Sequence, residues 1–120
     1  MTGAVADAAA SPGGSVSTHV LDATAGFPAA GVDIVLASRD AAGSWQAAER
    51  GVTGDDGRYR FAGPLGPGEW RLTFATGPYF ERRGTATFYP EVTITFLLCD
   101  GHYHVPLLLS PFAYSTYRGS

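Results

Sequence analysis

Hydrophobic and polar residues alternate along several short runs of the chain, and this two-residue period is typical of strands that bury one face. The clearest run spans residues 69–75, where the hydrophobic positions are Trp70, Leu72 and Phe74. Similar runs occur at residues 15–23, 32–38, 45–53, 58–61, 92–98, 102–109 and 114–118. Most of the 16 glycines and 8 prolines lie between these runs, as expected for the turns of an all-β domain. The pattern predicts about eight strands packed as a β-sandwich.

Three stretches depart from this alternation. The Asp-Asp-Gly sequence at 55–57 predicts a tight turn, because glycine after aspartate tolerates a positive φ at low cost. Residues 77–84 form the one predicted helix, of about two turns. Pro106 lies inside the run 102–109 and cannot donate to a strand ladder. We therefore expect either a local irregularity there or a proline nitrogen that faces an unpaired side.

Length and charge limit the possible classes of protein. The 120 residues fit one domain, which we place at 15–120 after a leader at 1–14. The net charge of −3 offers no basic surface for nucleic acid or an anionic membrane, and no apolar run approaches the ~20 residues of a membrane-spanning helix. The leader lacks the features of a secretory signal, so we expect a flexible leader on a cytoplasmic protein. Cys99 is the only cysteine, and its place after an apolar run predicts a buried, inert thiol.

The histidines are the first candidates for chemistry. His102 and His104 are two residues apart, so on a strand they share a face. They could act as general acid and base, or as two ligands of a metal ion. From this pair alone, however, an ordinary surface or core histidine is the favoured interpretation. A zinc hydrolase would need His19, from a distant strand, as a third ligand, which makes it the weakest alternative.

Other polar residues are equally ambiguous when they are taken one at a time. Arg58 follows the predicted turn and has the ordinary interpretation of a solvated residue at the start of a strand. Tyr117 and Arg118 fit an aromatic anchor and a surface charge near the end of the sequence. The glycine-rich segment 63–68 lacks the Lys-Ser/Thr ending and the following helix of a phosphate-binding loop. No single residue therefore identifies a function.

Five stretches together give a more specific pattern. They are STHVLDATAGFPAAGVDIVL (17–36), TGDDGR (53–58), FATGPYF (74–80), FYPEVTITF (88–96) and HYHVPLLLSPFAYSTYRGS (102–120). With these stretches the chain resembles the transthyretin-like 5-hydroxyisourate hydrolases over almost everything after residue 14. The final Tyr-Arg-Gly-Ser is the feature that separates this enzyme family from the hormone-carrying transthyretins of the same fold.

The resemblance implies a transthyretin-like (prealbumin-like) fold, an eight-stranded β-sandwich with one short helix. It also implies a homotetramer built as a dimer of dimers, with no membrane or nucleic-acid partner. In this fold the first, fourth, seventh and eighth strands share a sheet. The individually weak candidates would then converge on one sheet face, namely His19, Arg58, His104, Tyr117 and Arg118.

The implied reaction is the hydrolytic opening of the N1–C6 bond of 5-hydroxyisourate, a purine-derived small molecule, to 2-oxo-4-hydroxy-4-carboxy-5-ureidoimidazoline. Such a reaction needs a base near neutral pH and a donor to the attacked carbonyl oxygen. The resemblance assigns catalysis to His19, Arg58 and His104, without a metal ion or another cofactor. It assigns substrate binding to His19, Arg58, Tyr117, Arg118 and Ser120. Which histidine is the base stays open, and His102 is expected to lie behind the site or on the surface.

Two other functions fit parts of the sequence. Residues 26–36 and 53–74 also resemble the accessory β-sandwich binding modules that lie beside other domains and catalyse nothing. Such modules do not require the histidines or the final tetrapeptide. A transthyretin-like carrier of aromatic ligands would share the fold but lack the histidine and arginine set.

Overall fold

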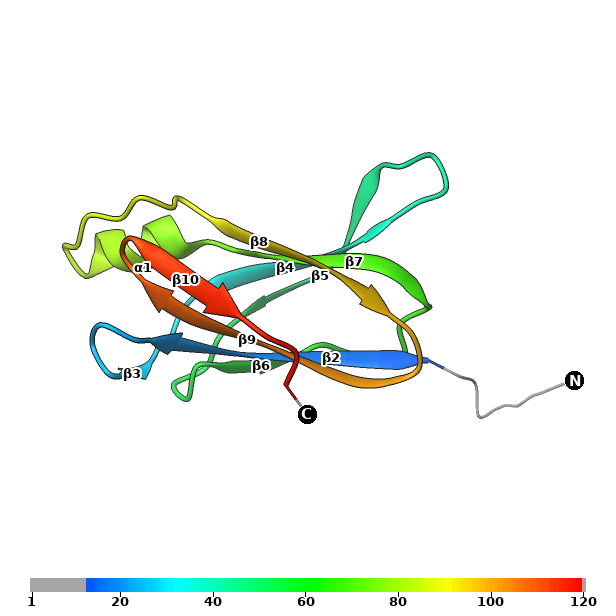
Figure 1. Cartoon of the computed structure of the whole chain (residues 1–120), viewed down its shortest axis with the longest axis horizontal. Helices are drawn as coiled ribbons and strands as arrows, with labels where there is room; N and C mark the ends of the chain where they lie inside the picture. The colour runs from blue at the N-terminus through cyan, green and yellow to red at the C-terminus, as the bar shows by residue number, and fades with distance from the viewer. Residues whose placement is uncertain (1–12, 120) are drawn as a thin grey trace, which may run out of the picture.

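The computed structural model describes residues 13–119, which form two β-sheets stacked face to face (Figure 1). The first sheet contains β2 (Gly14–Asp22), β3 (Phe27–Pro28), β6 (Arg58–Arg60), β9 (Gly101–Ser110) and β10 (Ala113–Thr116). The second sheet contains β4 (Asp33–Arg39), β5 (Trp45–Val52), β7 (Gly68–Phe74) and β8 (Val92–Leu98). Helix α1 (Thr76–Arg82) follows β7 and lies at one end of the sandwich. The predicted sandwich with one short helix is confirmed.

The core lies between the sheets and is built from the alternation in the sequence. In β2 every second residue is buried, and Val16 and Val20 are 0% exposed. Across from them the buried side chains of the second sheet include Ile34, Leu36, Leu72 and Phe74. Full burial of such a side chain contributes about 1.5–3 kcal/mol. The outer face of β2 is thereby left free for polar residues.

The strand order confirms the predicted grouping of the first, fourth, seventh and eighth strands. β2 pairs with β9 in parallel and with β6 in antiparallel orientation, and β10 is added at the outer side of β9. The connection between β2 and β4 contains the additional short strand β3, which pairs with the end of β2. Two distant segments of the chain, β2 and β9, therefore form the centre of this sheet.

Pro106 interrupts the ladder between β9 and β10. The last β10 pair is Thr116 with Leu107, and the chain pairs again as an isolated bridge between Gly119 and His104. Between them, the Thr116 hydroxyl donates to the Pro106 carbonyl oxygen at 2.7 Å. Main-chain N–H and C=O groups of one residue point to the same side of a strand, so the proline nitrogen also faces this gap. Of the two expected explanations, the unpaired side is correct.

Cys99 is exposed, so the prediction of a buried thiol was wrong. β8 ends at the buried Leu98, and Cys99 lies in the connection to β9. The strand therefore leaves the core one residue before the hydrophobic run in the sequence ends. No helix in the described range 13–119 is long and apolar enough to cross a membrane.

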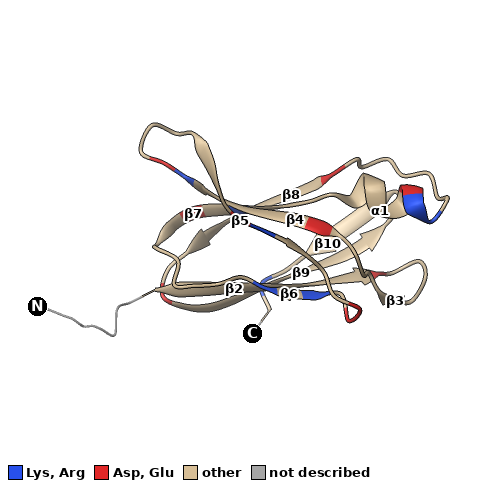
Figure 2. Ribbon diagram, turned by 180° about the vertical axis from the view of Figure 1, so that it is seen from behind, with Lys and Arg blue, Asp and Glu red and all other residues tan. Residues whose placement is uncertain are grey.

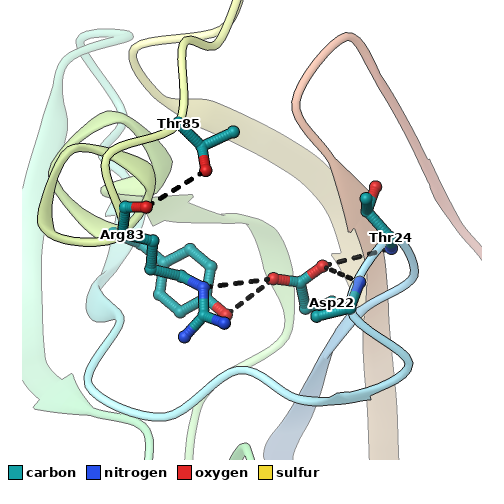
Figure 3. A network of polar contacts seen from close by, with 6 residues as sticks. Asp22, Thr24, Arg83 and Thr85 are labelled. Carbon is teal, nitrogen blue, oxygen red and sulfur yellow. Dashed lines mark hydrogen bonds and ion pairs between the residues drawn. The ribbon is translucent and has the colours of Figure 1, made fainter.

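Asp22 fixes the end of β2 to the helix (Figure 3). Its carboxylate is buried and accepts hydrogen bonds from the Tyr79 hydroxyl at 2.8 Å and from the amides of Thr24 and Ala25 at 3.1 and 2.9 Å. The Arg83 guanidinium adds an ion pair at 3.8 Å. Burial and the hydrogen bond to Asp22 raise the pKa of Tyr79 to about 12. This network is a structural anchor, because every donor in it comes from the chain itself.

Candidate active site

Three strands place the predicted catalytic residues on the outer face of the first sheet. His19 of β2 lies directly opposite Arg58 of β6 in the antiparallel register. His104 of β9 lies opposite Ser17, one outward position along β2 from His19. Directly opposed residues on neighbouring strands point to the same face. His19, Arg58 and His104 therefore lie on one face of the sheet. Figure 2 marks the basic residues of the short strand β6 in blue.

His104 has the geometry of a base that stays neutral near pH 7. Its Nδ1 atom lies 2.9 Å from the Ser17 hydroxyl, and within residues 13–119 its Nε2 atom makes no hydrogen bond. Burial lowers the pKa of His104 below its ordinary value, and the charges of Arg58, His19 and His102 lower it further. A lowered pKa keeps the lone pair of the imidazole available to accept a proton.

His19 contains an unusual polar atom. Its Nε2 is buried and, among the described residues, has no hydrogen-bond partner. A buried polar group without a partner costs about 1–3 kcal/mol. Among the described residues this is the buried side-chain polar atom left without a partner, so the Nε2 atom of His19 is a site for a hydrogen bond from outside the chain.

Arg58 is available to a ligand. Its only ion pair in the described chain is a long contact of 3.9 Å to Asp56, and the Arg58 side chain is 57% exposed. Arg58 borders a hollow of about 320 Å³ that is lined by Ser17, Thr18, Asp56, Arg58, Tyr59, Arg60 and His104. A guanidinium beside a neutral imidazole can hold an oxygen that becomes negative while the imidazole takes up a proton.

The segment after β10 covers one edge of His104. The Gly119 amide donates to the His104 carbonyl oxygen at 2.8 Å. A Cβ atom at Gly119 would lie 2.7 Å from Cδ2 of the His104 ring, so only glycine fits this close approach. Ser120, which the resemblance assigns to substrate binding, lies outside the described residues.

The other predicted binding residues lie elsewhere in the chain. Arg118 packs over the ring of Tyr103, with 4.2 Å from its guanidinium carbon to the ring centroid. Tyr117 is 60% exposed, and both residues line a second hollow beside β8 with Ile94, Phe96 and Val105. Within one chain, Tyr117 and Arg118 are therefore not brought together with His104.

Sequence reasoning missed Ser15 and Ser17. Their hydroxyls contact His102, at 2.6 Å from Ser15 to Nδ1 and 2.8 Å from Ser17 to Nε2. The serines lie on the outer face of β2, on either side of the inward-facing Val16. Only the pairing with β9 places their hydroxyls beside the histidines. In the described part of the chain, no three His, Cys, Asp or Glu side chains are grouped so that they could hold a metal ion.

Comparison with known proteins agrees with this geometry. Residues 16–119 match the family model of the HIUase/transthyretin family. The chain belongs to this family. The resemblance predicted from the five sequence stretches is thereby confirmed.

Individual relatives include both branches of the family. A 5-hydroxyisourate hydrolase of Salmonella dublin is 44% identical over 110 residues, which cover 88% of this chain and 80% of the relative. The structure of the Klebsiella pneumoniae 5-hydroxyisourate hydrolase is 39% identical, with a TM-score of 0.79 over 88% of this chain and 99% of that one. Transthyretin from Sparus aurata is 30% identical, with a TM-score of 0.83 over 87% of this chain and 95% of that one.

Proposed function

We propose that the protein hydrolyses 5-hydroxyisourate in purine degradation and that His19, Arg58 and His104 carry the reaction. The observation that carries the assignment is the meeting of these three side chains on one sheet face. Among residues 13–119, the Nε2 atoms of His19 and His104 have no hydrogen-bond partner, and the Arg58 guanidinium beside them is exposed with only a long contact to Asp56. The hydrolase function predicted from the sequence is confirmed by relatives with that activity at 39–44% identity. The division of roles among the residues is our own inference.

In this mechanism Nε2 of His104 takes a proton from water, and the resulting hydroxide attacks C6 of the substrate. The carbonyl oxygen becomes negative and is stabilised by the Arg58 guanidinium. When the N1–C6 bond breaks, N1 is the leaving group and receives the proton from His104. C6 stays bonded to its carbon neighbour and becomes a carboxyl group that ionises. The buried Nε2 of His19 pairs with the substrate or the attacking water and holds it in position. General-base assistance of this kind contributes about 10²–10⁴-fold in rate.

The assignment of Tyr117, Arg118 and Ser120 to substrate binding stays a prediction. Tyr117 and Arg118 border the second hollow at the β8 side of β9 in this subunit. We infer that they act at a site that neighbouring subunits complete. Its test is the Michaelis constant of an Arg118→Gln variant, which should rise while the variant keeps its assembly; an unchanged constant would remove Arg118 from binding.

We also infer that the chain forms a homotetramer, a dimer of dimers. β8 and β10 each lie at one edge of their sheet, so among the described residues the outer hydrogen-bonding edge of each strand has no neighbouring strand in a single chain. Large apolar side chains around these edges are exposed: Phe88, Leu97, Phe112, Tyr114 and Tyr117. Light scattering after size-exclusion chromatography should give the mass of four chains of 12.6 kDa each. A cytoplasmic location stays a prediction from the sequence.

The test of the activity is optical. Urate oxidase generates 5-hydroxyisourate, and its ultraviolet absorbance is followed with and without the protein against spontaneous decay. The expected result is a clear acceleration that a metal chelator does not reduce. A folded tetramer without activity would favour a transthyretin-like carrier, for which the similarity to the Sparus aurata protein is the supporting observation. A folded, inactive monomer would favour a binding module.

A further inference from the structure

An unbroken line of hydrogen bonds leads away from His104 toward the surface. The Ser17 hydroxyl lies 2.9 Å from Nδ1 of His104 and 2.8 Å from Nε2 of His102. The Ser15 hydroxyl lies 2.6 Å from Nδ1 of His102. The line therefore runs from half-buried His104 through Ser17 to exposed His102 and ends at Ser15.

The parallel register of β2 and β9 creates this arrangement. Ser15 lies opposite His102 and Ser17 lies opposite His104, so both pairs point to the outer face. Surface serines and histidines usually bond to water, and an isolated contact between them would carry little meaning. Here both nitrogens of one imidazole are held by hydroxyls, and one hydroxyl joins two imidazoles.

Counting hydrogens gives the line a direction. A hydroxyl has one hydrogen, and a neutral imidazole has one N–H and one lone pair on its nitrogens. At Ser17, one of the two bonds is therefore donated and the other accepted. If Nε2 of His104 is the base, Nδ1–H of His104 donates to Ser17. Ser17 then donates to Nε2 of His102, and Nδ1–H of His102 donates to Ser15.

We infer that His102 is a positioning residue that acts through Ser17: together they fix the tautomer of His104 and carry its surplus proton to the protein surface. This inference rests on the proposed function, because it takes His104 as the base. One proton arrives at Nε2 of His104 from water. One proton leaves Nδ1 of His104 for Ser17 as the Ser17 proton moves to Nε2 of His102. His104 is then neutral, His102 carries one positive charge, and no bond other than those to hydrogen has changed.

Electrostatics favours this movement of charge. An imidazolium at His104 would be half-buried beside a guanidinium, whereas His102 is exposed to water, which solvates the charge. The return of the proton to His104 is available for the later protonation of the leaving nitrogen. The titratable and charged groups around His104 come from each neighbouring element: His19 on β2, Arg58 and Arg60 on β6, Asp56 in the preceding turn and His102 on β9 itself.

The inference is tested by two variants, one rescue variant and one control variant. Ser17→Ala removes the relay hydroxyl, and His102→Gln keeps a hydrogen-bonding side chain that cannot take up a proton. Each should lower kcat by about tenfold with little change in KM, a modest share of the 10²–10⁴-fold of general-base catalysis. Ser17→Thr should restore most of the rate because it returns the hydroxyl. Ser44→Ala, in the hairpin between β4 and β5, is the matched control without effect.

Two readouts separate a proton relay from simple structural support. The rate of the wild-type protein is measured in mixtures of H₂O and D₂O. A plot of this rate against deuterium fraction should be curved, since several protons move together. The same plot should be linear for Ser17→Ala and His102→Gln. Nitrogen NMR of the three histidines should show His104 and His102 with the proton on Nδ1. In Ser17→Ala, His104 should lose this fixed tautomer.

The results distinguish the two proposals. The wild-type protein could be active while Ser17→Ala and His102→Gln both keep its kcat and its isotope curve. That result would overturn the relay and leave the proposed hydrolase function intact. A His104 with its proton on Nε2 would also overturn the relay, and this NMR result does not depend on activity. Absence of activity in the wild-type protein would instead overturn the proposed function.

Discussion

Asp22 and His19 lie three residues apart on one strand, yet their buried polar atoms have opposite surroundings. The Asp22 carboxylate accepts three hydrogen bonds from Tyr79, Thr24 and Ala25. In the described part of the chain, Nε2 of His19 is buried with none. Burial without a partner is costly for both groups, and more so for a charged carboxylate. The first group is satisfied by its own chain and stabilises the fold, while the second is open to a partner that binds from outside.

Alternation along β2 lets these two functions share one strand. Residues with even numbers from Gly14 to Asp22 are buried and face the core or the helix. Residues with odd numbers, among them Ser17 and His19, face the outer surface with His104. Substitutions on one face should therefore change stability and substitutions on the other should change rate. The following experiments can break that separation or define it more sharply.

The largest effect is expected for His104→Asn. This change removes the proposed base from a side chain that lies outside the core, so kcat/KM should fall by about 10²–10⁴-fold. The thermal midpoint and the assembly state should stay close to those of the wild type. The measurement is the decay of 5-hydroxyisourate absorbance beside a thermal unfolding curve. Retained activity would remove His104 from the mechanism, and collapse of the fold would show that the outer face is also structural.

Asp22→Ala should give the complementary result. It leaves the Tyr79 hydroxyl and two amides buried without their acceptor, and the free energy of unfolding should fall by about 3 kcal/mol. Asp22→Asn keeps one acceptor oxygen and should cost less. Urea unfolding at one fixed protein concentration measures both, since assembly adds to apparent stability. The rate per folded molecule should not change, and a loss of kcat at full stability would contradict the proposed separation.

A smaller effect is expected at Gly119, where the backbone approaches the ring of His104, the proposed base. An alanine Cβ would lie 2.7 Å from Cδ2 of His104, so either the ring or the covering segment must move. We expect about tenfold lower kcat/KM, because small displacements of a catalytic group are costly. Gly66→Ala is the matched control, since a Cβ there meets nothing within 4 Å. Equal activity of the two variants would show that the position of the ring is not critical.

The smallest effect is a shift in pH dependence. The pKa of His104 lies below its ordinary value of 6.5, through burial first and the Arg58 charge second. The acid limb of kcat/KM should therefore lie below pH 6.5. In Arg58→Gln the limb should move to higher pH, while Arg50→Gln, on the second sheet, should leave it in place. An unchanged limb in Arg58→Gln would mean that another group controls it.

The same shift has a defined sign for stability. The unfolded chain takes up a proton at His104 near pH 6.5, but the folded chain does so only at lower pH. The contribution of His104 is therefore complete above pH 6.5 and is lost as the pH falls toward the pKa of the folded state. The gap between the unfolding free energies of wild type and His104→Asn should stay constant above pH 6.5 and change in acid, where wild type loses stability relative to the variant. A wild type that instead gains stability relative to the variant in acid would reverse the assignment.

The sequence predicted what depends on neighbours in the chain. Alternation located the core faces of β2 and β7, and the Asp-Asp-Gly turn before β6 was correctly placed, with Gly57 at a φ of 75°. It could not show that Ser17 would bridge two histidines, because that contact depends on pairing with β9. The exposure of Cys99 was missed for a similar reason: hydrophobicity does not show where a strand leaves the core. The resemblance to a family supplied the pairing of strands that local patterns lack.

The parallel pairing of β2 with β9 has a consequence for how the protein acquires activity. Ser17 and His104 are 87 residues apart in the chain, and the same distance separates Ser15 from His102. Contacts between such distant residues form slowly, because a long loop must close before any of them can form. A chain that has folded only its hairpins would contain all three histidines but no site. Recovery of catalysis during refolding should therefore coincide with closure of the whole sandwich. The time course of the recovered activity would then measure the rate of that step.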